Sequence, residues 1–278
     1  MDKVELNGDV SSASMKLVAS GFKKEVGRSF SEAALSYDRL AELQRQVGER
    51  LLSRLDEEKR CFSKIADLGA GTGFCTEKLA EQFPEASILA LDIAPGMLKQ
   101  ARERVLTHQN VSFCVGDAEQ LPVTQDAIEL IISNLAIQWC DSDRLFDGFY
   151  RVLKPDGLLL FSSFGPETLC ELKQAWDQVD NHQHVNEFSD TERLKRLINT
   201  AGFKNCLIER VQVKRFYKSA FELMRELKGI GAQTITDGRV SHLTGKGQML
   251  KMVEAYELMR EERGIPATWE IVYGFARK

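Results

Sequence analysis

Glycine and acidic residues follow one predicted strand in a pattern suited to holding a ligand. The run Asp67–Gly73 (DLGAGTG) closes a short apolar strand, and its glycines fall at Gly69, Gly71 and Gly73. Glycine lets the backbone turn sharply and approach a ligand without a clash from Cβ. Phe74 stands where a dinucleotide-binding fingerprint has its third glycine. The spacing therefore disfavours a nicotinamide cofactor and the oxidoreductases that use one.

Three further predicted strands also end in polar residues. Asp92 ends the second strand, where a carboxylate can accept hydrogen bonds from both ribose hydroxyls of a nucleoside. Asp117 follows the third strand, where it can accept from an adenine amino group, and Ser133–Ala136 follows the fourth, beside the crevice where such sheets bind ligands. Each residue alone is more often a loop residue or a helix cap. Four suitable residue types at four successive strand ends are hard to obtain by chance.

The elements that must position these residues alternate between strand and helix. Apolar runs predict strands over Ser63–Leu68, Ser87–Ile93, Val111–Val115, Ile128–Ser133 and Leu158–Phe164. Helical patterns cover Phe74–Phe83, a segment that starts at Pro95, Asp141–Leu153 and Thr191–Ala201, and Lys154–Gly157 reads as a turn. This alternation predicts an α/β fold with a parallel, doubly wound sheet.

The two ends of the chain add to this sheet. One amphipathic helix is predicted over Phe30–Leu52, ahead of the first strand. Two late strands, Lys204–Val213 and Trp269–Ala276, are separated by about fifty-five residues with helical patterns at Ala220–Lys228 and Gln248–Glu262. That segment is too long and too patterned for a loop, so we expect a helical cap inserted before the last strand. The expected domains are a tail and lid helix (1–60), a core (61–212 and 268–278) and a cap (213–267).

Composition narrows the classes of function. The chain has 278 residues, 43% hydrophobic and 28% charged, with a formal net charge of −4. That balance disfavours nucleic acid as a partner, and no apolar run is long enough to cross a membrane. The N-terminus lacks a secretory pattern and the six cysteines form no CxxC pair, so we expect a cytoplasmic protein with reduced thiols. His182 and His184 have no third ligand in view, which favours a surface turn and no metal site.

The segment Lys204–Lys251 is basic although the whole chain is acidic. It contains ten Lys or Arg and four Asp or Glu, a local balance of +6. Such a segment can receive an acidic partner by charge complementarity. A solvated helix face explains the same charges equally well.

The motifs between Lys64 and Phe164 resemble the seven-stranded class I S-adenosylmethionine-dependent methyltransferases. The resemblance implies that the three glycines flank the methionine part of the cofactor, that Asp92 holds the ribose and that Asp117 reads the adenine. Asp67 would support the glycine loop through the cofactor's amino group. The other cofactor contacts expected from it are Gln44, Ile93, Ala118 and Asn134.

Segments outside the cofactor motifs resemble one family within this class. The family is the malonyl-acyl carrier protein O-methyltransferases, which start pimelate synthesis for biotin. The segments are Val26–Val47, Ser133–Trp139, Phe164–Trp176, Phe221–Thr234 and Ala255–Ala276. Trp269 and Phe275 depart from the expected Tyr and His, which puts no part of the cofactor chemistry in doubt.

The resemblance implies methyl transfer to the free carboxylate of a malonyl thioester. A carboxylate is ionised at neutral pH, so the reaction needs positioning and desolvation rather than a general base. The residues expected to hold it are Tyr37, Gln44, Gln138 and Trp139, although core packing explains the aromatic ones as well. Arg225 and Lys228 can meet the carboxylate or the carrier's phosphopantetheine. The wider pool of carrier contacts is Lys214, Arg215, Lys218, Arg225, Lys228, Arg239 and Lys246.

Two other functions fit the same cofactor motifs. The first is a methyltransferase for a small carboxylic acid or a quinone precursor, which would not need a carrier protein. The second is a non-catalytic cofactor-binding partner, which would often lose part of the cofactor motif. Here every expected position of that motif is filled.

Overall fold

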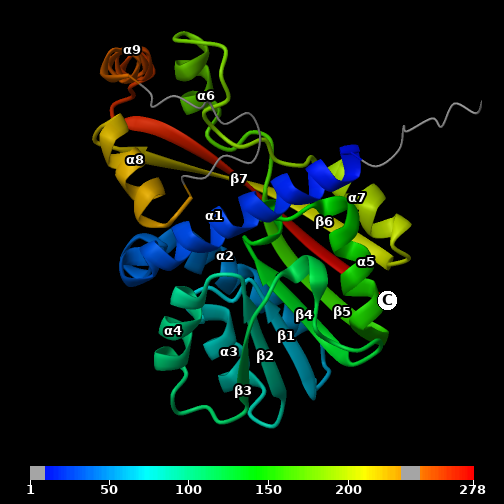
Figure 1. The fold of residues 1–278 in the computed structure, drawn as a ribbon. Helices are drawn as coiled ribbons and strands as arrows, with labels where there is room; N and C mark the ends of the chain where they lie inside the picture. Colours follow the sequence, from blue (N-terminus) through cyan, green and yellow to red (C-terminus); the bar gives the residue numbers. More distant parts are fainter. Residues whose placement is uncertain (1–9, 233–244) are drawn as a thin grey trace, which may run out of the picture.

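Seven strands form one mixed sheet in the order β3-β2-β1-β4-β5-β7-β6 (Figure 1). The computed structural model describes residues 10–232 and 245–278. The strands are β1 Lys64–Leu68, β2 Ser87–Asp92, β3 Val111–Val115, β4 Ile128–Asn134, β5 Leu153–Phe164, β6 Lys204–Tyr217 and β7 Ile265–Arg277. Strands β1 to β5 pair in parallel, and β7 runs antiparallel to both of its neighbours. The predicted seven-stranded α/β architecture is confirmed.

Helices cover both faces of the sheet. They are α1 Val10–Leu40, α2 Glu42–Ser53, α3 Phe74–Gln82, α4 Pro95–Arg104, α5 Ser142–Val152, α6 Cys170–Asp177, α7 Thr191–Thr200, α8 Ala220–Gly229 and α9 Lys246–Glu257. Helices α5 and α7 pack on one face, and α2 and α3 pack on the other. Because neighbouring side chains of a strand point to opposite faces, strands buried on both faces must be apolar throughout. This requirement explains continuous runs such as Leu158–Phe161 in β5.

The prediction of one N-terminal helix over Phe30–Leu52 is wrong. Helix α1 begins at Val10 and ends at Leu40, and α2 starts after a break at Ala41, whose φ and ψ are −84° and 38°. In a continuous helix the carbonyl of Asp38 would accept from the amide of residue 42. Instead it accepts from the guanidinium of Arg45. The side-chain bond replaces a backbone bond at the point where the chain changes direction.

Three other boundaries differ from the predictions. The expected turn at Lys154–Gly157 lies inside β5 as an irregularity, because the pairing with β4 moves from Leu153 to Leu158. Strands β6 and β7 are both longer than predicted and pair as far as Tyr217 and Ile265. The second cap helix, α9, ends at Glu257 rather than at residue 262.

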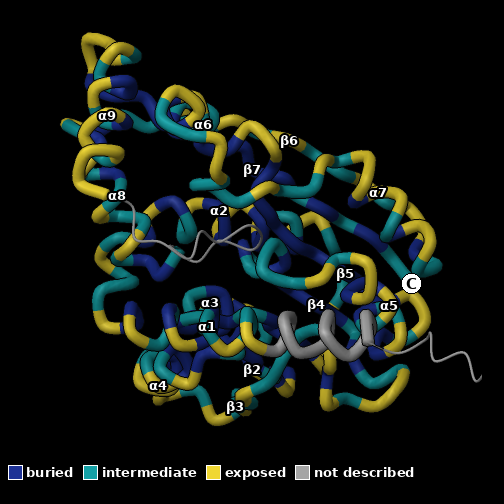
Figure 2. Tube along the Cα trace, turned by 45° about the horizontal axis from the view of Figure 1, so that its top comes forward, coloured by how far each residue is buried: buried dark blue, intermediate teal, exposed yellow. Residues whose placement is uncertain are grey.

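The segment between β6 and β7 shares a core with the sheet. Leu223 of α8 and Met252 and Tyr256 of α9 are fully buried, in one cluster with Leu43 of α2 and Trp269 of β7. Figure 2 shows exposed outer turns on both cap helices and buried positions facing inward. The cap therefore depends on the sheet and on α2 for its apolar contacts.

Membrane-spanning helices and disulfide bonds are both absent from the described part of the chain. None of the helices in residues 10–232 and 245–278 combines the length and apolarity that crossing a membrane requires. All six cysteines are free thiols.

The close approach of β7 to β5 gives a test of the sheet packing. A Cβ added at Gly274 would lie 2.1 Å from the ring of Phe161, which is fully buried. We expect Gly274→Ala to lower the free energy of unfolding by about 1–3 kcal/mol, measured by urea denaturation, because a packed core cannot absorb the extra atom. Gly148→Ala in α5 is the control, since a Cβ there meets nothing within 4 Å. Equal losses in the two variants would contradict this packing.

Candidate active site

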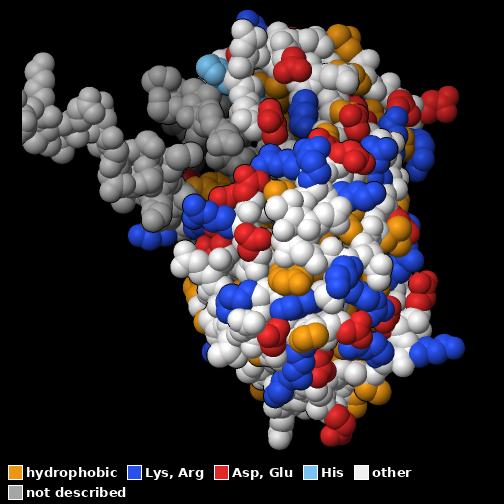
Figure 3. All heavy atoms as spheres, turned by 90° about the vertical axis from the view of Figure 1, so that its right-hand side faces the viewer, with side chains coloured by type: hydrophobic (Ala, Val, Ile, Leu, Met, Phe, Trp, Pro, Cys, Tyr) orange, Lys and Arg blue, Asp and Glu red, His pale blue; other side chains and the backbone are white. Residues whose placement is uncertain are grey.

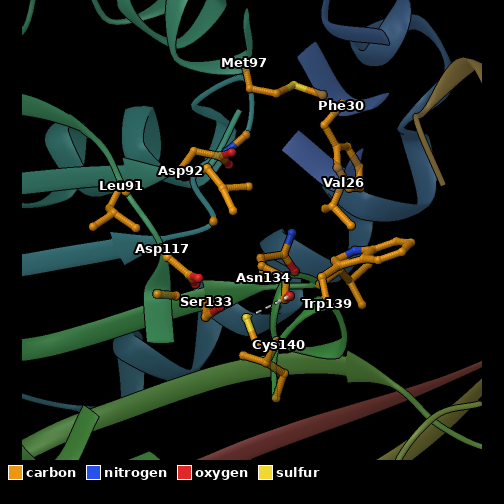
Figure 4. Close-up of a pocket in the computed structure, with 18 of the residues that line it drawn as sticks. Val26, Phe30, Leu91, Asp92, Met97, Asp117, Ser133, Asn134, Trp139 and Cys140 are labelled. Carbon is orange, nitrogen blue, oxygen red and sulfur yellow. Dashed lines mark hydrogen bonds between the residues drawn. The ribbon is translucent and has the colours of Figure 1, made fainter. Parts of the chain in front are cut away.

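A cavity opens at the carboxyl ends of β1, β2 and β4, and α1 closes it from above (Figure 4). It encloses about 720 Å³ of space, part of which is open to solvent. Asp92 and Asp117 point toward it from the strand ends, and Val26, Phe30 and Trp139 face them from the other side. A smaller cavity continues it under the start of α2. Four residues line both spaces: Tyr37, Gly69, Gly71 and Asn134.

The glycine loop forms the floor where the two cavities meet. Gly69 and Gly71 have φ values of 75° and 56°, which side chains with a Cβ rarely adopt. A Cβ at Gly69 would lie 2.2 Å from the Cβ of Ala136, whereas a Cβ at Gly71 would meet nothing within 4 Å. Gly71 therefore leaves open space beside the loop that a ligand can fill. Gly73 lies outside both linings and instead allows α4 to approach, with a Cβ there 2.9 Å from that of Ala101.

Asp92 ties the glycine loop to the second strand. Its carboxylate accepts from the amide of Gly71 at 2.8 Å and from the amide of Ala94 at 2.7 Å. Burial raises the pKa of Asp92, while these backbone bonds favour the charged form. Two backbone donors use only part of the acceptor capacity of a carboxylate. The remaining acceptor capacity is chemically suited to ribose hydroxyls, and the ribose role of Asp92 stays a prediction.

Asp67 and Gln44 lie at the second cavity. Asp67 is buried and accepts from the hydroxyl of Thr76 at 2.6 Å. Burial raises the pKa of Asp67 to about 7, with a further increase from Asp92 and an opposing effect of Thr76. The Oε1 atom of Gln44 is buried without a hydrogen-bond partner in the described part of the chain. A buried carboxylate and an unpartnered amide oxygen are acceptors, so this pair fits a ligand's ammonium group.

Asp38 joins α1 to the loop and to α4, a role that the sequence did not reveal. Its carboxylate accepts from the hydroxyl of Thr72 at 2.6 Å and from the guanidinium of Arg104. Arg104 also lies 3.6 Å from the carboxylate of Glu77. Nearer the middle of α1, the Ser31 hydroxyl accepts from the amide of Gly96 at 3.2 Å. These bonds hold the C-terminal half of α1 over the cavity.

Lys23 holds α1 at the other end of the cavity. Its ammonium lies 3.1 Å from Asp117 and 2.6 Å from Glu119. Burial opposes the charge on Lys23, but Cys140 and the two carboxylates raise the pKa of Lys23 above its ordinary value. Asp117, Glu119 and Cys140 are also near enough to one another to offer three metal ligands. The lysine offsets one of the two negative charges of this cluster and occupies acceptor capacity of Asp117, the residue predicted to read adenine.

The candidates for holding the substrate carboxylate do not all share one cavity. Tyr37 and Trp139 line the main cavity, where Trp139 packs edge-on against Phe30 with ring centroids 5.4 Å apart. Burial, together with Asp92 and Asp38, raises the pKa of Tyr37, so its phenol stays neutral. Gln138 instead lines a separate cavity with Ser163 and Arg193. The structure thus separates Gln138 from Tyr37 and Trp139.

The basic residues of the cap fall into two groups. Lys214 pairs with Glu261 at 2.6 Å, and Arg215 pairs with Glu226 at 2.9 Å. Lys218, Arg225, Lys228 and Lys246 are exposed and form no ion pair with another described residue. Arg239 lies outside the described residues.

The histidine pair is only partly a surface turn. His182 is exposed, as predicted. The ring of His184 stacks on Trp176 at 3.6 Å and its Nε2 lies 2.8 Å from Asp180. His184 therefore belongs to the packing between α6 and the loop that follows it.

The fold and the cavity define the class of protein. The strand order, the glycine loop after β1 and the acidic residues after β2 and β3 are those of class I S-adenosylmethionine-dependent methyltransferases. Residues 65–157 match a family model described as a methyltransferase domain. The fold resembles that of the YcgJ protein of Bacillus subtilis, with a TM-score of 0.59 and 15% identity, over 83% of this chain and 98% of that one. A phosphoethanolamine N-methyltransferase of Haemonchus contortus, solved with S-adenosylhomocysteine, has a TM-score of 0.60 at 18% identity, over 92% of this chain and 60% of that one.

Sequence similarity gives the family. A malonyl-acyl carrier protein O-methyltransferase of Nitrosospira multiformis is 40% identical, over 92% of this chain and 89% of the relative. A protein of the same name from Hahella chejuensis is 42% identical, over 90% and 88% of the two chains. The chain belongs to the malonyl-acyl carrier protein O-methyltransferase family.

The raised pKa of Asp67 predicts a pH dependence of cofactor binding. Only the carboxylate form can pair with the cofactor's ammonium, and in the ligand-free protein that form is lost as pH falls through about 7. We expect the Kd for S-adenosylhomocysteine, measured by calorimetry between pH 7.5 and 5.5, to rise by up to about tenfold per pH unit below 7. Asp67→Asn should bind weakly at every pH with a flat profile, and Asp56→Asn, an exposed carboxylate, should behave as wild type. A flat wild-type profile would contradict the assignment.

Lys23 pairs with Asp117 and Glu119, so we predict that α1 becomes less ordered when the Lys23 ammonium is removed. Lys23→Met leaves two neighbouring carboxylates without their cation, so hydrogen exchange over residues 21–36 should become faster. Lys24→Met is the matched control, because Lys24 is exposed and forms no ion pair with another described residue. Equal exchange in the two variants would show that Lys23 does not fasten α1.

Proposed function

We propose that the protein transfers a methyl group from S-adenosylmethionine to the free carboxylate of a malonyl group carried on acyl carrier protein. The observation that carries this proposal is the two-part cavity under α1, with acidic acceptors for a nucleoside amino acid and neutral aromatic donors beside them. The names of the relatives supply the substrate. The proposal includes a cytoplasmic location, where such a carrier and free thiols are expected.

The cofactor would lie along the floor of the joined cavities. When bound, S-adenosylmethionine supplies an electrophilic methyl group on a sulfonium. We expect Asp92, which lines the main cavity, to accept from the ribose, and Asp67 and Gln44, which line the smaller one, to accept from the amino group. Ile93, Asp117 and Ala118 line the end where the adenine would fit. The backbone of Gly69 and Gly71 allows close approach, while Gly73 acts only through packing.

The substrate carboxylate needs orientation more than activation. It is ionised at neutral pH, so no group has to remove a proton from it. Tyr37 and Trp139 can each donate one hydrogen bond while remaining neutral. Neutral donors hold a carboxylate without a full opposing charge and therefore reduce its nucleophilicity less than an ion pair would. The apolar side chains of Val26, Phe30 and Met97 exclude water from the same space.

Intact mass of the carrier tests this function. Malonyl-acyl carrier protein, malonyl-CoA and free malonate would each be incubated with the protein and S-adenosylmethionine. We expect the carrier to gain the mass of one methyl group, which an esterase removes, with little transfer to free malonate. Methylation of free small acids without any on the carrier would contradict the proposal. That outcome would indicate an enzyme for a diffusible acid.

A further inference from the structure

We propose that the exposed face of α8 is the docking surface for the carrier protein, through an acidic face of that partner. The surface consists of Lys218, Phe221, Arg225 and Lys228, and is called here the α8 face. The inference rests on the proposed function and adds to it the site of partner recognition. The intervals of four and three residues place Phe221, Arg225 and Lys228 along one side of the helix. Lys218 precedes the N-cap residue, Ser219, and adds a base just before the start of the helix.

Exposure distinguishes this face from the rest of α8. Its four residues are all exposed, and Phe221 has 46% of its surface accessible although it is a large aromatic residue. The opposite side is buried, with Ala220 and Leu223 in the core shared with the sheet. An accessible aromatic ring next to arginine is the composition that protein interfaces favour at their centre.

The two acidic residues of α8 are held by donors within the fold. Glu222 accepts from the backbone amide of Lys218 at 2.6 Å and so closes the start of the helix. Glu226 is bound by Arg215 at 2.9 Å and by the hydroxyl of Tyr217 at 3.1 Å. The three bases of the α8 face are exposed while these carboxylates are engaged, so the face can attract a negatively charged partner.

The other side of the molecule provides a contrast. In Figure 1, α8 lies on the left, and Figure 3 shows the right-hand side, where positive and negative side chains are intermixed. Several bases of the core are bound in pairs, including Lys154 with Glu129 at 2.8 Å and Lys278 with Asp126 at 2.6 Å. Such paired charges give little net field toward a partner. Arg225 and Lys228 of α8 differ in this respect, because neither pairs with an acidic residue of 10–232 or 245–278.

The C-terminal end of α8 contacts α1, the helix that covers the cavity. The carbonyl of Gly229, which follows Lys228, accepts from the Ser36 hydroxyl of α1 at 3.0 Å. Two residues further, a Cβ at Gly231 would lie 3.0 Å from the ring of Phe30, a residue that lines the cavity. From Phe221 to Lys228 the helix rises by about 10 Å. A carrier bound here would stand next to α1, within a short distance of the space that must receive its thioester.

Charge reversal separates docking from chemistry. We expect Arg225→Glu/Lys228→Glu to raise the KM for malonyl-acyl carrier protein by roughly tenfold or more at low salt, with kcat retained at saturation. The KM for malonyl-pantetheine, which lacks both protein and phosphate, should stay within about twofold of wild type. Phe221→Ser should raise the carrier KM in the same selective way, with a smaller dependence on salt.

The control variant is Lys64→Glu/Lys204→Glu. It changes the net charge equally, at two exposed lysines that begin β1 and β6. Both lie at the end of the sheet opposite the strand ends that line the cavity. An equal KM increase in the control, or an unchanged carrier KM in the α8 variants, would overturn the docking surface while wild-type transfer stands. Absence of transfer to the carrier by the wild-type protein would instead contradict the proposed function itself.

Discussion

Two carboxylates buried at the ends of neighbouring strands set the main constraint on this molecule. Asp67 and Asp92 lie at the adjoining ends of β1 and β2, where burial raises the pKa of both groups. Charge in such a position is costly unless donors surround it. The hydroxyl of Thr76 and the amide of Gly71 supply part of that set, and the bend of the glycine loop is what brings the second donor into place. The open space beside Gly71 is where further donors from a ligand can complete it.

Helix α1 covers the carboxyl ends of these strands and so encloses the site. It is fastened near its middle by Lys23 and near its C-terminal end by Asp38, and between them Ser31 bonds to the start of α4. The Ser36 hydroxyl of the same helix also donates to the carbonyl of Gly229 at the C-terminal end of α8. A single element therefore joins the cofactor cavity to the proposed carrier surface. The contacts of Lys23 and Asp38 are therefore expected to influence both sites.

The sequence predicted the strand ends well because their chemistry is local. The glycines and Asp92 are recognisable from residue type and spacing alone. Lys23 and Asp38 were missed because their partners lie 94 and 66 residues away, at Asp117 and Arg104. The break at Ala41 was missed because the apolar periodicity continues through it, while the side chain of Arg45 replaces a backbone bond. No signal in the sequence marks that replacement.

For residues that are close in sequence, only the tertiary structure showed which of them can reach a ligand or a partner. Gln138 and Trp139 sit on one 3₁₀ turn, Ile137–Trp139, where successive side chains diverge by about 120°. One of them lines the cofactor cavity and the other does not. Among the basic residues, Arg215 lies beside Glu226 and is consumed in an ion pair, whereas Arg225 on the outer side of α8 is exposed. Composition gave the total charge of the segment, and tertiary contacts decide which charges a partner can meet.

Methyl transfer by this protein depends most directly on how the joined cavities hold the cofactor. A crystal structure of the protein with S-adenosylhomocysteine would test it. The predicted result has both ribose hydroxyls on the carboxylate of Asp92 and the amino group near Asp67 and the Oε1 atom of Gln44, with α1 closed above. A ligand bound outside the two cavities, or a Gln44 oxygen still without a partner, would contradict the account.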